Sequence, residues 1–230
     1  MLLAIDTSSL VLSCALAEED RLIAEWTVQR KLTHSEQLIP HMDEMMKEAG
    51  VSKKEISAIA VSIGPGSFTG LRIGLATAKM ASYIWKVPLI GVDTLEALAW
   101  NMAGAQAFVL PLLDAQRGNV YAALYGAFDE LWQEEKEEAA PIDEVIEAAL
   151  CHGGPIIAVG ECADKYRDKL LAAGIKLAPP HNRLARAGSV ALAGLKRLSA
   201  GVKDDPLQLL PNYIRRSEAE VLWEKRHGKS

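Results

Sequence analysis

The residues Leu2-Leu3-Ala4-Ile5-Asp6-Thr7-Ser8-Ser9 open the chain and carry the pattern that decides the fold. The apolar part predicts a buried strand that ends at Asp6, and the three hydroxyl residues after it predict a turn. Further strands are predicted at 11–17 and 22–28, each after a short polar turn. The first part of the chain is therefore predicted to be a three-stranded meander.

The same pattern returns after Gly104. Residues 107–114 form a second apolar run that ends in Asp114, and residues 119–126 predict a second returning strand. A shift of 108 positions places similar residues on each other: Asp6 on Asp114, Ile5 on Leu113, Leu12 on Val120, Ala15 on Ala123 and Leu16 on Leu124. A chain of 230 residues also suits two lobes of about 110 residues. We therefore predict two similar lobes, 1–103 and 104–230.

Elsewhere, predicted strands alternate with predicted helices, which is the α/β pattern. Thr33 and Glu36 have the spacing of a capping box, which predicts a helix from there to Gly50. The periodicity predicts further helices at 69–85, 93–102, 142–150, 163–173 and 185–200, and further strands at 56–63, 88–92 and 156–159. It assigns no element to the acidic segment 129–138 or to the tail 207–230.

Composition narrows the class of protein. A net charge of -5 and a hydrophobic fraction of 50% exclude a disordered or supercharged chain. No uncharged apolar run reaches membrane-spanning length, the start lacks a basic segment, and the three cysteines form no C-x-x-C pair. We expect a cytoplasmic protein without a membrane partner. Residues 182–230 carry 10 basic and 5 acidic side chains, so this basic tail is either a nucleic-acid contact or a solvated end.

The strand-ending aspartates suggest one kind of chemistry. An Asp beside a hydroxyl-rich turn in each of two lobes is how an actin-like ATPase or a sugar kinase holds a metal-bound nucleotide. The turn after Asp6 contains no glycine, although a close backbone approach to phosphate usually needs one. A turn capped by its own side chains is the favoured interpretation. A vestigial nucleotide cleft formed by Asp6, Thr7 and Asp114 remains the alternative.

A second glycine-rich segment, Gly64-Pro65-Gly66-Ser67-Phe68-Thr69-Gly70, lies between a predicted strand and a predicted helix. A helix N-terminus favours an anion, but this segment has neither the P-loop ending nor the dinucleotide spacing. The helix that follows carries small residues every four positions: Gly70, Gly74, Ala78 and Ser82. Such a stripe permits close helix packing, either inside the lobe or against another molecule.

These motifs, together with His34-Ser35-Glu36-Gln37-Leu38, the strand 88–92, Leu113-Asp114-Ala115-Gln116-Arg117 and Pro211-Asn212-Tyr213, resemble the TsaB family of tRNA threonylcarbamoyladenosine biosynthesis proteins. The resemblance covers nearly the whole chain. It implies an actin-like, ribonuclease-H-type fold of two lobes, with duplicated mixed sheets flanked by helices. It further implies a non-catalytic scaffold for modification of the adenosine beside the anticodon. The implied partners are a TsaD-like transferase, a TsaE-like ATPase that supplies the P-loop, and tRNA only through the complex.

The resemblance also implies an interface on the first two helices of the first lobe, used for the transferase or for a homodimer. The predicted interface residues are His34, Leu38, Ser67, Phe68, Gly70, Leu71, Gly74, Leu75 and Ala78. The catalytic relative TsaD has a His-x-x-x-His metal pair where this chain has Thr94 and Leu98, so we expect no metal site and no cofactor. An ATP-dependent phosphotransferase using Asp6 and Asp114, or a metalloprotease, remains an alternative. The absence of phosphate-loop glycines and of paired metal ligands disfavours both.

Overall fold

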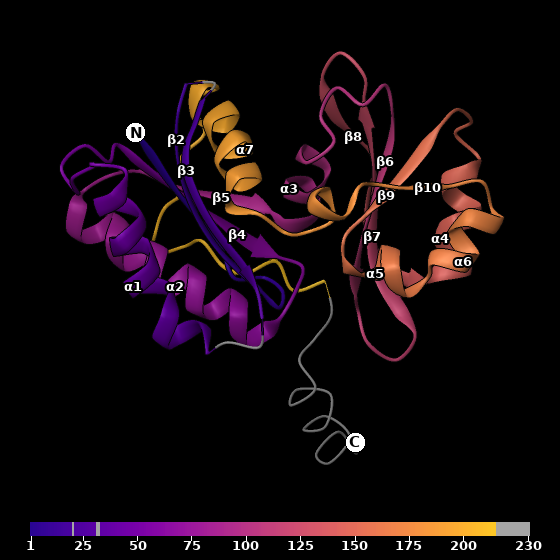
Figure 1. Cartoon of the computed structure of the whole chain (residues 1–230), viewed down its shortest axis with the longest axis horizontal. Coiled ribbons are helices and arrows are strands. Elements are labelled where there is room, and N and C mark those ends of the chain that lie inside the picture. Colours follow the sequence, from indigo (N-terminus) through magenta and orange to yellow (C-terminus); the bar gives the residue numbers. More distant parts are fainter. Residues whose placement is uncertain (20, 31–32, 215–230) are drawn as a thin grey trace.

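The computed structural model describes residues 1–19, 21–30 and 33–214. These residues form two five-stranded sheets with helices packed on them (Figure 1). The first sheet contains β1 (Leu2–Asp6), β2 (Val11–Glu18), β3 (Arg21–Gln29), β4 (Ala58–Gly64) and β5 (Leu89–Asp93). The second contains β6 (Ala107–Asp114), β7 (Asn119–Ala127), β8 (Leu131–Pro141), β9 (Ile156–Val159) and β10 (Lys176–Leu177).

The two sheets have the same topology. Their strand orders are β3-β2-β1-β4-β5 and β8-β7-β6-β9-β10. In each sheet the central strand, β1 or β6, pairs antiparallel with the next strand of the chain and parallel with a later strand. The predicted duplication of mixed sheets is confirmed.

The register corrects the predicted alignment of the two lobes by one residue. Asp6 pairs with Ser13 across the first hairpin, whereas Asp114 pairs with Val120 across the second. The shift of 108 positions therefore holds for β1 and β6, but the returning strands correspond at a shift of 107. The second turn is one residue shorter, so the predicted match of Leu12 with Val120 was wrong.

The first sheet is buried on both faces, which explains the unbroken apolar run of β1. Leu3 and Ile5 pack with α1 (His34–Glu48) and α2 (Phe68–Trp85), whereas Leu2 and Ala4 pack with α7 (Ala187–Ser199). Successive side chains of a strand point to opposite faces. Each residue of β1 therefore contributes to one of the two helix layers.

The second sheet shares a helix with the first. One face packs against α4 (Ile142–Leu150), α5 (Glu161–Lys165) and α6 (Arg167–Ala172). The other face packs against α3 (Thr94–Trp100), whose Leu95 and Leu98 contact the second lobe while Ala97 joins the core of the first. Figure 1 shows α3 between the two sheets. The lobes are thus joined through a common apolar layer.

The end of the described chain returns to the first lobe. Besides α7, a segment after it runs beside the first sheet: the Asp204 N–H donates to the Leu89 carbonyl, and the Asn212 N–H donates to the Ile63 carbonyl. Residues 187–214 therefore pack on the first sheet, which differs from the predicted division at 103. The local sequence could not reveal this, because the partners of α7 lie far earlier in the chain: Ala187 donates to Ser13 and Gly188 donates to Glu25, 174 and 163 positions away.

Some elements differ from the prediction. The acidic segment belongs to β8, the predicted helix 163–173 is divided at Tyr166, and a short 3-10 helix, Pro180–Asn182, precedes α7. Thr33 makes no side-chain capping bond, and its carbonyl accepts the first helical N–H groups instead. The basic residues Arg215, Arg216, Lys225 and Arg226 lie outside the described residues. Among the residues described, no helix has the length and apolar character needed to cross a membrane.

Candidate functional site

The turn after β1, which was predicted to be either self-capped or a phosphate site, bonds to itself. Asp6 is fully buried, and its Oδ1 accepts the Ser8 N–H at 2.8 Å and the Ser8 hydroxyl at 2.7 Å. Burial raises the pKa of the Asp6 carboxyl. Its Oδ2 has no hydrogen-bond partner among the described residues. The Ser8 N–H is therefore already used within the turn and is not free to bind a phosphate.

The glycine-rich loop packs directly on this turn. The Ser67 N–H donates to the Ser8 carbonyl at 2.6 Å, and the Thr7 hydroxyl donates to the Gly70 carbonyl at 2.8 Å. A Cβ at Gly66 would lie 2.3 Å from the Ser8 carbonyl oxygen, and one at Gly70 would lie 2.0 Å from that of Thr7. Because Gly66 and Gly70 have no side chain, the backbone of the loop can contact the backbone of the turn within the same lobe.

Asp114 has a different environment from its counterpart in the first lobe. Its carboxylate is exposed and lies 3.0 Å from the Lys165 ammonium group. Its backbone N–H donates to Glu161 Oε1 at 3.4 Å. The strand-ending aspartates thus occupy equivalent positions in the two sheets, but one is buried and one is paired at the surface.

The small-residue stripe faces the inside of the lobe. Gly70, Gly74, Ala78 and Ser82 are buried, and a Cβ at Gly74 would lie 2.3 Å from the Thr7 hydroxyl. The predicted interface residues Leu38, Leu71, Leu75 and Ala78 are buried in the core as well. Close packing against β1 uses the stripe, so these four residues are not on the surface of the isolated chain, and their role in an interface stays a prediction. His34 is half-buried, and Ser67 and Phe68 are exposed.

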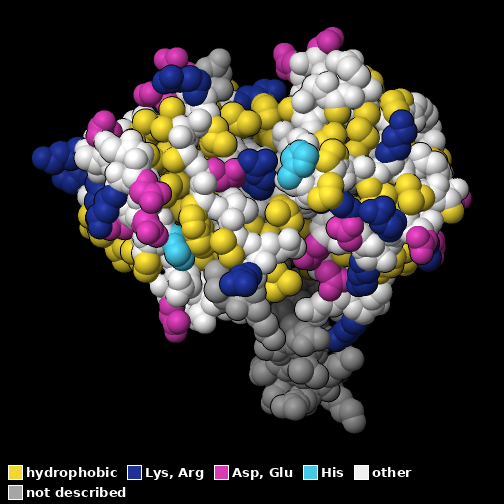
Figure 2. All heavy atoms as spheres, viewed as in Figure 1, with side chains coloured by type: hydrophobic (Ala, Val, Ile, Leu, Met, Phe, Trp, Pro, Cys, Tyr) yellow, Lys and Arg dark blue, Asp and Glu magenta, His cyan; other side chains and the backbone are white. Residues whose placement is uncertain are grey.

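The opposite face of α2 is the one that solvent reaches. It exposes Ala76, Met80 (59%), Tyr83 (77%) and Ile84 (62%), and α1, which contacts α2, exposes Ile39. Figure 2 shows hydrophobic side chains at the surface over α1 and α2, between charged side chains. We call these five residues the α2 face. This face could have been predicted from the sequence. When a stripe of small residues packs against a neighbouring element, the residues on the opposite side of the helix point outward.

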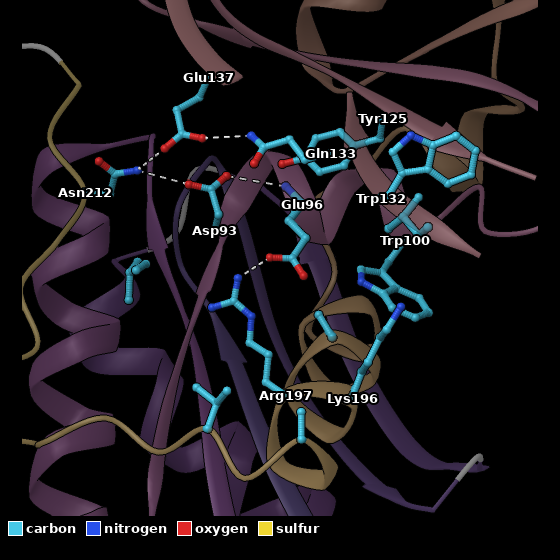
Figure 3. A pocket seen from close by; sticks show the side chains of 15 residues that line it. Asp93, Glu96, Trp100, Tyr125, Trp132, Gln133, Glu137, Lys196, Arg197 and Asn212 are labelled. Atoms are coloured by element: carbon cyan, nitrogen blue, oxygen red, sulfur yellow. Dashed lines mark hydrogen bonds and ion pairs between the residues drawn. The ribbon is translucent and has the colours of Figure 1, made fainter. Parts of the chain in front are cut away.

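A cavity of about 570 Å³ lies between the lobes, and none of the predicted site residues lines it. Asp93 ends β5, as Asp6 ends β1, and caps α3: its Oδ1 accepts the Leu95 N–H at 2.8 Å. Its Oδ2 accepts the Asn212 side-chain amide at 3.1 Å, and the same nitrogen donates to Glu137 on β8 at 2.9 Å (Figure 3). Asn212 thus connects a carboxylate of the first lobe with one of the second.

The cavity is polar on one wall and aromatic on the other. Trp100, Tyr125 and Trp132 line it together with an ion pair between Arg197 on α7 and Glu96 on α3 (Figure 3). Burial, with a further contribution from the charge of Glu137, raises the pKa of Asp93 to about 7. Asp93 therefore changes its charge near neutral pH at the junction of the lobes.

Comparison with known proteins assigns the family. Residues 29–223 match the family model of TsaD, tRNA N6-adenosine threonylcarbamoyltransferase. The chain is 32% identical over 228 residues to the tRNA threonylcarbamoyladenosine biosynthesis protein TsaB of Bacillus subtilis (strain 168). The matched region covers 96% of this chain and 97% of that protein. This chain belongs to the TsaB family.

Other relatives agree. TsaB of Escherichia coli (strain K12) is 29% identical over 233 residues, with 99% of each chain covered. The solved structure of YeaZ from Pseudomonas aeruginosa superimposes with a TM-score of 0.79 at 25% identity, over 92% of this chain and 98% of that one. A ROK hexokinase from Thermus thermophilus, with a TM-score of 0.53 at 11% identity, shares the fold alone. The TsaB-family chain therefore has the predicted two-lobed, actin-like fold.

The two positions at which the resemblance implies the TsaD metal pair lie inside α3. Thr94 and Leu98 are one helical turn apart and both are fully buried. Their side chains offer one hydroxyl and no imidazole, so they cannot replace two histidine ligands. Within the described ranges, no group of three or more His, Cys, Asp or Glu side chains is arranged to hold a metal ion.

Proposed function

We propose that this TsaB-family chain is a non-catalytic scaffold subunit in tRNA threonylcarbamoyladenosine biosynthesis. One observation carries the proposal: the turn after Asp6 and the loop 64–70 bond to each other where an actin-like enzyme would bind phosphate. A catalytic role in that cleft would require both segments to separate. The phosphotransferase and metalloprotease alternatives have no comparable support from the residues described.

The α2 face supplies the surface that a scaffold needs. Monomeric proteins rarely expose large apolar side chains next to one another, and such patches mark interaction sites. We propose that a TsaD-like transferase binds here and that a homodimer uses the same face when the transferase is absent. A TsaE-like ATPase then supplies the P-loop that this chain lacks, and tRNA binds to the assembled complex.

A reconstituted modification assay tests the proposed function. Purified chain, TsaD-like transferase, TsaE-like ATPase and tRNA are combined with an activated threonylcarbamoyl donor, and each protein is omitted in turn. We expect no product without the transferase and at least about a tenfold lower rate without this chain, because a scaffold acts by positioning other groups.

Two outcomes would contradict the proposal. One is product formation by the chain alone in a preparation free of the transferase. The other is full activity of the transferase and the ATPase when the chain is left out. Steady ATP hydrolysis by the chain alone, lost in Asp6→Asn, would support the phosphotransferase alternative instead.

A further inference from the structure

A basic hollow lies on the second lobe, away from the cavity between the lobes. It is formed by α6, β10 and the segment that follows β10, and it encloses about 470 Å³. Its charged lining residues are Arg167, Lys176 and Arg183, and no carboxylate lines it. We call it the β10 hollow. Three cations around one hollow are conspicuous in a chain whose net charge is -5.

Two of these cations have no partner in the described part of the chain. The side chains of Arg167 and Lys176 are exposed and form no hydrogen bond or ion pair with any described residue. Their neighbours behave differently: Lys169 on α6 binds Asp143, and Lys165 on α5 binds Asp114. Among the described residues, Lys165 and Lys169 are thus paired with carboxylates, whereas the side chains of Arg167 and Lys176 at the hollow are not.

The third cation is built into the fold. The Arg183 side chain is only 8% exposed and forms an ion pair with Asp164. Its Nε has no hydrogen-bond partner among the described residues. Asp164 compensates the charge of this guanidinium, so Arg183 contributes to the hollow mainly as a fixed part of its wall. Pro179 and Pro180 form part of the wall, and the fixed backbone angle of proline keeps that wall rigid.

We propose that the β10 hollow binds a phosphate group, and that in the assembled complex this phosphate belongs to the backbone of tRNA. The unpaired guanidinium of Arg167 and ammonium of Lys176, on a hollow that no carboxylate lines, are the usual donors to phosphate oxygens. The hollow is larger than one phosphate, so the adjoining sugar fits beside Leu171 and Leu177. The tRNA half of the proposal rests on the proposed function, whereas the phosphate half does not.

Binding of tRNA by the complex with the transferase is measured by fluorescence anisotropy at several salt concentrations. The test variant is Arg167→Gln/Lys176→Gln, and the matched control is Lys47→Gln/Lys169→Gln, which removes two lysines that are already paired. Loss of two phosphate contacts should flatten the slope of log affinity against log salt by about 2 and weaken binding at least about tenfold. The control should bind as the wild type does. Sedimentation first establishes that each complex has formed.

Inorganic phosphate provides the second arm, on the chain alone. Its ³¹P line width should broaden with wild-type chain and with the control, but not with the test variant. Phosphate broadening with an unchanged tRNA slope would keep the phosphate site and overturn its assignment to tRNA. An unchanged slope together with equal line widths for all three proteins would overturn the whole proposal. If no complex forms, equal line widths alone would overturn it, because they are measured on the chain alone. Because both substituted residues are exposed, the test variant should melt as the wild type does.

Discussion

The Gly74→Arg variant is expected to lose its stable fold, whereas Ala76→Arg melts at the wild-type temperature. Gly74 faces β1, where even a Cβ would lie 2.3 Å from the Thr7 hydroxyl, and that hydroxyl is held by the Gly70 carbonyl. An arginine there separates α2 from the sheet and leaves an unpaired charge in the core. The free energy of unfolding should fall by at least about 4 kcal/mol.

That loss is a large part of the roughly 5 to 15 kcal/mol that stabilises a typical domain. The measurement is urea unfolding followed by circular dichroism, with Ala76→Arg as the matched control because it places the same side chain on the exposed face of the same helix. If both variants unfold at the same urea concentration as the wild type, the stripe does not pack against β1 as described.

The second large effect is a pH dependence of stability that comes from Asp93. Its pKa is raised to about 7 in the folded chain from an ordinary value of 3.8. Between these two values the folded chain keeps a proton that the unfolded chain has lost. The contribution of Asp93 to the free energy of unfolding therefore falls by at most about 4 kcal/mol as the pH rises through this window. Above about pH 7 it stays constant.

The Asp93→Asn variant removes this titration and keeps a good helix cap, since Asn and Asp cap equally well. We expect it to gain stability relative to the wild type as the pH rises from 5 to 8, measured by urea unfolding at each pH. The control Asp143→Asn removes an exposed carboxylate and should show no such trend. A difference between Asp93→Asn and wild type that is the same at pH 5 and pH 8 would contradict the buried, proton-retaining carboxyl.

Local pattern was enough for much of the fold. The runs that end at Asp6 and Asp114 predicted the repeated hairpins, because a strand buried on both faces is apolar throughout. The local pattern did not predict β8, because its charged residues 134–138 show no alternation of apolar and polar side chains. That strand lies at a sheet edge and forms because β7 offers a hydrogen-bonding partner. An interaction set by a neighbouring strand leaves little signal in the segment itself.

The candidate sites were likewise predicted only where the signal lies within one segment of the chain. The spacing of Gly70 and Gly74 correctly predicted a close approach, but spacing cannot tell whether the neighbour is β1 or another molecule. The cavity between the lobes was missed because Asp93, Glu137 and Asn212 come from segments far apart in the chain. One feature of the sequence pointed to this cavity: Asp93 is the last residue of its strand, as Asp6 and Asp114 are of theirs.

Sedimentation velocity of the chain mixed with the TsaD-like transferase tests the central claim most directly. The wild type and a conservative Ala76→Ser control should sediment with the transferase as one complex. The Ala76→Arg variant should remain a folded monomer, both alone and in the mixture, because a charge on the α2 face opposes burial of its apolar side chains. Co-sedimentation of folded Ala76→Arg with wild-type affinity would show that the transferase does not bind through the α2 face.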